Sequence, residues 1–393
     1  MVAETISLGI LALPRSLKVV GMIPGLILLI GFGILASYSG YVIGQYKIAY
    51  PHIHSMADAG EVLFGRIGRE ILGAGQLLFF VFIMGSHILT FAIAMDAITD
   101  GKYCNIIWMV VGLFLSLVFT IPRTLKHLSF YSIASFASII GAVMITMIGV
   151  SITKPGYING VPSIGMWPRP GVSFHDAFEA VNTMVFAYAG HVAFFSFISE
   201  LREPRDFPKA LAFLQASDIS MYIITAVVVY YYAGVEVKSP ALLSASPVVM
   251  KVAFGIAMPT IIIAGVVNGH VAVKYLYVRM FRNSKDDVMH QKTLKAWGSW
   301  IAICATLWVL AWLIAEAVPV FNHLVSLTSA LFASWFTFGL SGMFWLDLNL
   351  KWEQRGKMWL PTWKRGGGWR KWFLTMVNIG NVIIGALLAS SYP

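Results

Sequence analysis

Long hydrophobic runs separated by short polar breaks follow one another from end to end of this sequence. A membrane-spanning helix needs about 20 mostly apolar residues, and ten further stretches of this kind follow an apolar opening segment at residues 1–20. The pattern therefore predicts an all-α polytopic membrane protein with about 11 transmembrane helices. We place the ten later spans at residues 23–46, 71–95, 106–121, 130–152, 177–198, 211–233, 248–281, 297–315, 321–346 and 372–391.

The composition excludes an ordinary soluble domain. Of the 393 residues, 58% are hydrophobic and 12% are charged, whereas soluble domains carry about 25% charged residues. The hydrophobic runs leave no stretch for a separate soluble enzyme domain. The two cysteines, Cys104 and Cys304, give neither a disulfide framework nor a paired metal-binding spacing. We therefore expect no metal and no cofactor.

Basic residues fall mainly on one side when the loops are assigned alternately to the two sides of a membrane. With residues 1–20 as the first span, 20 of the 28 Lys and Arg residues lie in loops on the same side. Cytoplasmic loops carry such an excess, so this side is predicted to face the cytoplasm and the C-terminus to face outward. Topology then accounts for the net charge of +10, and we expect no nucleic-acid partner.

Two apolar runs contain residues that favour an interrupted helix. In the first span, Ser7 and Gly9 stand shortly before Pro14; in the sixth, the segment FAYAGH at residues 186–191 places small and polar aromatic residues at the centre of the run. Irregular backbone at membrane depth is tolerated only where it lines a cavity or is buried in protein. Corresponding breaks in two five-span halves are typical of inverted-repeat transporters.

Other small residues in the spans are interpreted as packing positions, since glycine lets membrane helices approach closely. In the second and third spans these are Gly31, Gly33, Gly40, Gly73 and Gly75. Ser55 and Asp58 fit a capping box at the start of an amphipathic helix, residues 56–69, on the inner surface.

At two such breaks, backbone N–H and carbonyl groups lack hydrogen-bond partners within the helix, and these groups suit a small zwitterion. N–H groups at the start of the half-helix after the first break carry the positive end of a helix dipole and can hold a carboxylate. Carbonyl groups at the second break can accept an ammonium. Because no side-chain countercharge is required, a neutral amino acid is the predicted substrate. The predicted substrate-binding residues are Ser7, Leu8, Gly9, Ile10, Phe186, Ala187, Tyr188 and Gly190.

Four segments resemble the amino acid/auxin permease (AAAP) family, most closely its fungal members of the methyltryptophan-resistance (Mtr) neutral amino acid permease type. The most specific is ELREPRDFPKAL at residues 200–211. The others are MVAETISLGILALP at residues 1–14, EVLFGRIGR at residues 61–69 and NGHVAVKYLYVRMF at residues 268–281.

This resemblance implies an eleven-span, five-plus-five inverted-repeat fold shared with the leucine-transporter superfamily. The chain is then a single transmembrane transporter domain, with a first repeat at about 1–153, a second at about 176–346 and a final helix at about 372–391. Members of the family import neutral amino acids by proton symport across the plasma membrane. They carry a tail and a first half-helix ahead of the segment that matches Met1, so the first helix here is expected to be truncated, with consequences for transport competence.

Ionisable residues inside spans are costly and are functional candidates by default. For proton coupling we favour Glu4 and then His191, since both adjoin a predicted break; Lys274 competes as a fixed ammonium in place of a sodium ion. Glu179, Asp218 and Glu316 are interpreted as charges satisfied near the membrane interfaces. We expect the pocket walls to include Met84, Ser86, Val267 and Asn268.

Three other functions remain open from the residues alone. The first is a vacuolar amino acid exporter of the same family, which has the same sequence features. The second is a protein that does not transport, because its first helix is incomplete. A membrane-embedded enzyme is the least favoured, because His52 and His54 form only a loop HxH motif and no metal-binding histidine pair shares a helical face.

Overall fold

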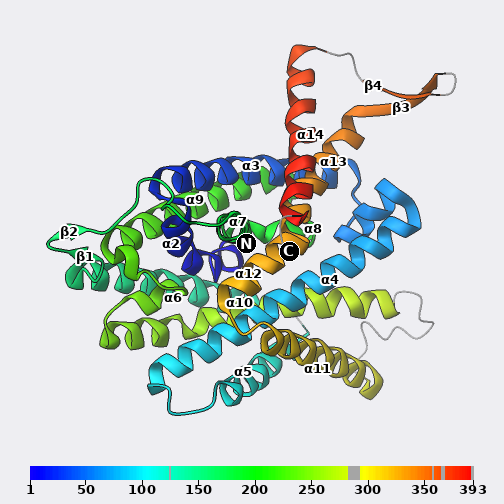
Figure 1. The fold of residues 1–393 in the computed structure, drawn as a ribbon. Helices are drawn as coiled ribbons and strands as arrows, with labels where there is room; N and C mark the ends of the chain where they lie inside the picture. Colours follow the sequence, from blue (N-terminus) through cyan, green and yellow to red (C-terminus); the bar gives the residue numbers. More distant parts are fainter. Residues whose placement is uncertain (124, 282–292, 356–357, 364–367, 391–393) are drawn as a thin grey trace.

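The computed structural model is built almost entirely of helices (Figure 1). It describes residues 1–123, 125–281, 293–355, 358–363 and 368–390; within these ranges, the side chains of residues 3–4, 125–130, 351–355 and 358–363 are outside the description. Two short hairpins are the only strands in the described ranges. The predicted all-α class is confirmed.

The helices of the first half of the chain contain the first interruption. They are α1 (Val2–Thr5), α2 (Gly9–Val20), α3 (Met22–Ala49), α4 (Met56–Thr99), α5 (Asn105–Thr120) and α6 (Leu125–Thr153). The hairpin of β1 (Tyr157–Ile158) and β2 (Val161–Pro162) follows.

The second half contains the second interruption. Its helices are α7 (Phe174–Ala187), η1 (Ala189–Ala193), α8 (Phe194–Glu200), η2 (Pro204–Asp206), α9 (Phe207–Ala233), η3 (Gly234–Glu236), η4 (Ala241–Ser244), α10 (Pro247–Phe281), α11 (Leu294–Ala317), α12 (Phe321–Thr328), η5 (Ser329–Ala333), η6 (Trp335–Gly339), α13 (Leu340–Asn349) and α14 (Trp369–Ser390). A hairpin of β3 (Leu350–Arg355) and β4 (Met358–Trp363) precedes α14.

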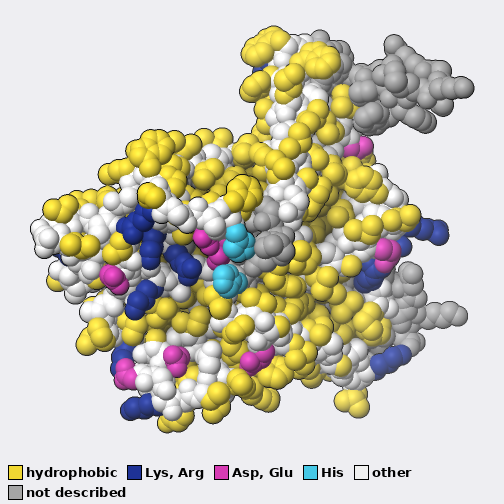
Figure 2. Space-filling view, viewed as in Figure 1, with side chains coloured by type: hydrophobic (Ala, Val, Ile, Leu, Met, Phe, Trp, Pro, Cys, Tyr) yellow, Lys and Arg dark blue, Asp and Glu magenta, His cyan; other side chains and the backbone are white. Residues whose placement is uncertain are grey.

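Eight described helices are long and apolar enough to cross a membrane, and the bent pair that begins with α7 makes a ninth span. The 16-residue helix α5 is apolar but shorter, and the opening run is divided into the short helices α1 and α2. The predicted count of 11 is therefore not established. Figure 2 shows a mainly hydrophobic face with Lys and Arg gathered toward two opposite ends, as expected for a protein surrounded by lipid.

The element α4 contains both the helix predicted at the inner surface and the third span, and it is kinked at Gly65. The predicted capping box is present: the Ser55 hydroxyl accepts from the Asp58 N–H at 3.2 Å, and the Asp58 carboxylate accepts from the Ser55 N–H at 3.0 Å. Gly65 then takes φ 67° and ψ −152°, a conformation open essentially only to glycine. The change of direction in α4 (Figure 1) thus follows from one residue.

Four of the five predicted packing glycines lie against a neighbouring helix. A Cβ at Gly33 would lie 2.6 Å from Ile219, and one at Gly40 would lie 2.8 Å from Leu211, both on α9. Gly73 faces Tyr275 and Gly75 faces Phe336. The prediction for Gly31 is wrong, because a Cβ there would meet no atom of the described residues within 4 Å. Sequence pattern identifies small residues but not the side of the helix that carries them.

The two predicted interruptions lie at the centre of the bundle. Helices α2 and α7 pack against each other, with α9 and α3 on one side and α10 and α4 on the other (Figure 1). α14 packs on α13 and projects from the rest. The surrounding helices hold the irregular segments inside protein, as membrane-depth backbone requires.

Candidate functional site

The first interruption covers Ile6, Ser7 and Leu8. Helix α1 ends at Thr5, and Ile6 has φ −80° and ψ 75°, outside the helical region. Helix α2 begins at Gly9, so its first N–H groups have no partner one turn earlier in the helix. Pro14 lies inside α2 and does not itself break the helix. The break therefore exposes the positive end of a 12-residue half-helix at the centre of the bundle.

The second interruption lies at Tyr188. Helix α7 ends at Ala187, the short 3-10 helix η1 follows, and the axis bends by 41° before the span resumes in α8. The Ala187 carbonyl accepts a hydrogen bond from the Tyr222 hydroxyl at 2.8 Å, which leaves its second lone pair for another donor. Both predicted interruptions are thus present at the residues that the sequence pattern indicates.

The two interruptions touch each other. A Cβ on Gly9 would lie 2.6 Å from the Ala187 Cα, a distance that real side chains essentially never show. Tyr222, on α9, places its hydroxyl 3.0 Å from the Thr5 carbonyl and 2.8 Å from the Ala187 carbonyl. One phenol thus lies within hydrogen-bonding distance of the ends of both half-helices, and its single O–H can donate to either carbonyl. Sequence reasoning missed Tyr222 because nothing in the local pattern of α9 marks it.

A small cavity of about 20 Å³ lies between the two interruptions. This volume is on the scale of one water molecule. Six of the eight predicted substrate-binding residues line it: Ser7, Leu8, Gly9, Phe186, Ala187 and Gly190. The other two do not, because Ile10 is fully buried and the Tyr188 hydroxyl donates instead to the Leu29 carbonyl at 3.0 Å.

Thr5 and Ala189, beside the two interruptions, also line the cavity, and the rest of its described wall comes from α4 and α10. Ile83 and His87 supply the α4 side, in place of the expected Met84 and Ser86, and Asn268 supplies the α10 side as expected. The His87 ring nitrogen Nδ1 lies 2.7 Å from the Ile261 carbonyl, so a hydrogen bond to α10 fixes the imidazole. His87 is the only ionisable side chain among the described residues that line this cavity.

His191 is held between two backbone carbonyl groups. Its Nδ1 lies 3.0 Å from the Tyr188 oxygen at the second interruption, and its Nε2 lies 2.8 Å from the Ala36 oxygen on α3. A neutral imidazole has one N–H, whereas an imidazolium has two. Only the protonated ring can donate to both carbonyls at once, whereas the neutral ring donates to one of them.

The other two proton-coupling candidates are placed differently. Lys274 lies on α10 and forms an ion pair with Glu200 at 2.9 Å, and both side chains are about half exposed. Glu4 belongs to α1, but its side chain lies outside the described residues. Asp218, interpreted from the sequence as an interface charge, is instead 1% exposed and accepts from the Thr5 hydroxyl at 3.3 Å beside the first interruption.

A metal site has no support from the geometry of the described residues. Within them, no three His, Cys, Asp or Glu side chains are close enough together to hold a metal ion. In the HxH motif, the His54 ring contacts the Ser199 hydroxyl at 3.0 Å. Cys104 is exposed and Cys304 is buried, as free thiols.

Comparisons with known proteins agree with this architecture. The crystal structure of MhsT in complex with L-phenylalanine superposes with a TM-score of 0.55 at 13% identity, covering 100% of this chain and 97% of that one. The leucine-transporter-like fold implied by the resemblance is thereby confirmed.

Sequence relatives are transporters by name. The N amino acid transport system protein of Neurospora crassa is 37% identical over 353 residues, which cover 89% of this chain and 75% of that protein. Amino acid transporter AVT1H of Arabidopsis thaliana is 25% identical over 399 residues, 99% and 85% of the two chains. Residues 1–389 match the family described as transmembrane amino acid transporter protein. With its interrupted helices and this match over nearly its whole length, the chain belongs to the transmembrane amino acid transporter family.

Proposed function

We propose that the protein imports neutral amino acids by proton symport, with the substrate bound between the two interruptions and exposed alternately to the two sides of the membrane. The observation that carries this proposal is the contact of the α2 N-terminus with the end of α7. N–H groups at one interruption suit a carboxylate, and carbonyl groups at the other suit an ammonium.

The lining of the central cavity favours a substrate whose side chain is uncharged. Its described wall contains Ile83, Leu8 and Phe186 and no carboxylate, lysine or arginine. A charged substrate side chain needs a countercharge when it leaves water. The one ionisable side chain in this wall, His87, is already bound to the Ile261 carbonyl, so aliphatic and aromatic amino acids are favoured over acidic and basic ones.

The size of the cavity supports alternating access. At about 20 Å³ it is too small for an amino acid, so binding requires the half-helices to separate. Tyr222 and His191 join the interruptions to α9 and α3 by hydrogen bonds, and these contacts are the ones that a movement of the half-helices would break. We assign substrate-linked movement to α1, α2, η1 and α8.

The two acceptors around His191 support proton coupling. Histidine is the side chain whose ordinary pKa lies closest to physiological pH, and protonation adds the second N–H that its two carbonyl partners require. A proton carried inward with the substrate gains about 2.3 kcal/mol per 100 mV, and every 1.4 kcal/mol corresponds to a tenfold ratio. One proton therefore supports more than tenfold accumulation from the voltage alone.

Uptake by proteoliposomes tests this function. We expect labelled leucine and phenylalanine to accumulate when the outside is more acidic than the inside, with or without sodium. Lysine and glutamate are expected to compete poorly. Equal uptake under all gradients would indicate a facilitator and contradict symport, and accumulation driven only by sodium would replace the proton with another ion.

We place the protein in the plasma membrane, as the resemblance implies, rather than in the vacuole. A fluorescent fusion expressed in a fungal cell tests this assignment. Signal at the cell periphery is expected, and signal confined to the vacuolar membrane would favour the exporter.

A further inference from the structure

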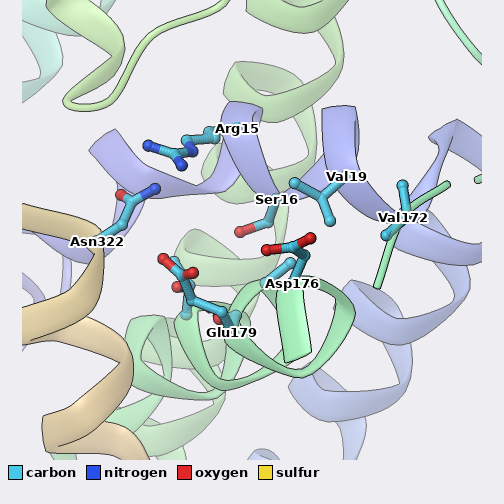
Figure 3. Close-up of a pocket in the computed structure, with 9 residues that line it drawn as sticks. Arg15, Ser16, Val19, Val172, Asp176, Glu179 and Asn322 are labelled. Carbon is cyan, nitrogen blue, oxygen red and sulfur yellow. Dashed lines mark hydrogen bonds between the residues drawn. The ribbon is translucent and has the colours of Figure 1, made fainter. Parts of the chain in front are cut away.

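A second cavity, with a polar lining, lies beside the central site, between α2, α7 and the start of α12 (Figure 3). Its volume is about 180 Å³, against about 20 Å³ at the interruptions. Its lining includes Arg15, Ser16, Val19, Asp176, Glu179 and Asn322. We call it the outer cavity, since the charge pattern of the loops places this end of α2 outside.

Opposite charges face each other across the outer cavity. Figure 3 shows Arg15 and Asn322 together on one side, and Asp176 and Glu179 pointing into the cavity from α7 on the other. Arg15 is near enough to Asp176 for their charges to interact. Ser16 points into the space between them. A cation on one wall and carboxylates on the facing wall match the two charges of a zwitterion.

Asn322 holds the guanidinium in place. We assign the orientation of its amide from the neighbouring groups, so that the oxygen accepts from Arg15 Nε at 2.9 Å and Nη1 at 3.1 Å and the nitrogen donates to the Ser239 hydroxyl at 2.6 Å. The opposite amide orientation would set the amide nitrogen against guanidinium donors. A guanidinium has five N–H donors in a planar fork, so donors remain for a carboxylate after Asn322 has accepted two.

Glu179 is a buried carboxylate at the opposite wall. The residue is 8% exposed, and its Oε1 lies 3.2 Å from His323 Nδ1 on α12. A buried carboxylate is costly without a cationic partner; His323 is such a partner only when it is protonated, whereas an ammonium in the outer cavity would supply a permanent positive charge. Asp176 also faces this space, but its carboxylate already accepts from the Ser173 hydroxyl at 2.7 Å as the cap of α7. Glu179 is therefore the stronger site for the ammonium.

The outer cavity is lined by the same two half-helices, α2 and α7, that form the central site. Arg15 follows Gly9 by six residues along α2, and Thr183, which lines the outer cavity, precedes Ala187 by four residues along α7. At 1.5 Å per residue these intervals correspond to about 9 Å and 6 Å. The outer cavity therefore lies only about one to two helical turns from the interruptions.

We propose that the outer cavity is a second amino-acid site, which binds the substrate before it enters the central site. The α-carboxylate pairs with Arg15, the α-ammonium pairs with Glu179, and Val19 faces the substrate side chain. The ligand class is a zwitterionic α-amino acid with an uncharged side chain. This inference rests on the proposed function, since it supplies an entry site for the same substrate.

Equilibrium dialysis of labelled leucine against the purified full chain tests the inference. The wild type is expected to bind two leucine molecules per chain. Arg15→Gln and Glu179→Gln are each expected to weaken one of them by at least about tenfold, the loss of a charge-assisted contact. Lys18→Gln is the matched control: it removes a positive charge one turn further along α2, from a residue that does not line the outer cavity. The Lys18→Gln variant is expected to bind both leucine molecules as the wild type does.

A central-site variant separates this inference from the proposed function. Gly9→Ala drives a Cβ into Ala187, so it is expected to abolish central binding and keep the outer leucine. One leucine in the wild type, lost in Gly9→Ala and unchanged in Arg15→Gln, would overturn the outer site and leave the proposed function standing. A second leucine that survives both Arg15→Gln and Glu179→Gln would also overturn it. Absence of any binding in a folded wild type would contradict both.

Discussion

At the scale of single residues, hydrogen bonds made by a few buried polar side chains organise the interrupted segments. Tyr222 contacts the carbonyls of Thr5 and Ala187, and His191 contacts those of Tyr188 and Ala36. Backbone carbonyls freed by a helix break must find donors inside the membrane. These two side chains supply such donors, and both contacts depend on residues far apart in the sequence.

We expect Tyr222→Phe to slow leucine uptake at least tenfold while lowering the free energy of unfolding by only about 1 kcal/mol, the usual value of one hydrogen bond. The phenyl ring keeps its packing, and only the link between the interruptions is lost. Tyr230→Phe is the matched control, because Tyr230 is equally buried on α9 and its hydroxyl accepts from the Gly165 N–H at 2.8 Å, away from both interruptions. Equal uptake by the two variants would show that the Tyr222 bridge has no role in transport.

We expect His191→Asn to flatten the pH dependence of uptake. Wild-type uptake should rise as the outside is acidified from about pH 7.5 to about 5.5, because the protonated ring donates to both of its carbonyl partners. An asparagine amide donates at the same place without titrating in this range. His270→Asn is the control, since this buried histidine contacts the Pro122 carbonyl at 3.0 Å and lies outside the interruptions. An unchanged pH profile in His191→Asn would remove His191 from proton coupling.

At the scale of elements, sequence pattern predicts where the two spans are interrupted, but the close approach of α2 to α7 is seen only in the structure. Sequence pattern predicts that Ser7 to Ile10 and Phe186 to Gly190 are interrupted, because small and polar residues within an apolar run are visible in one dimension. It does not predict which helix faces which. The α4 wall of the cavity therefore comes from Ile83 and His87 rather than Met84 and Ser86, and Gly31 faces no neighbour.

We expect Gly9→Ala to reduce leucine uptake at least tenfold, since the added methyl group would lie 2.6 Å from the Ala187 Cα and would push the two interruptions apart. Gly31→Ala adds the same methyl group where nothing lies within 4 Å. Uptake and thermal stability of the two variants, measured side by side in proteoliposomes and detergent, check this prediction. A Gly9→Ala protein that transports as well as Gly31→Ala would contradict the close approach.

At the scale of the whole molecule, hydrophobic run length and the position of basic residues predict the membrane class and a topology, and family resemblance predicts the fold. The outer cavity could not be predicted from the sequence, because it is formed by α2, α7 and α12, which no local pattern brings together. The β3–β4 hairpin was also missed, since the sequence predicts only a loop between the spans at residues 321–346 and 372–391. The repeat boundaries near residues 153 and 176 stay predictions.

Labelling of Cys104 tests the topology. The thiol is exposed at the start of α5, in a loop that the charge pattern places outside. We expect a membrane-impermeant maleimide to label intact cells, and Cys104→Ser to abolish this labelling. Cys304, buried in α11, should stay unmodified in both proteins. Labelling that appears only after the membrane is permeabilised would reverse the orientation.

The most direct test of the central claim is an experimental density map of the protein with bound leucine. We predict leucine between the two interruptions, with its carboxylate at the N–H groups of Gly9 and Ile10 and its ammonium near the carbonyls of Phe186 and Ala187. The half-helices should have moved apart to enlarge the cavity. An unbroken helix through Ser7 to Ile10, or leucine bound only outside this site, would contradict the account.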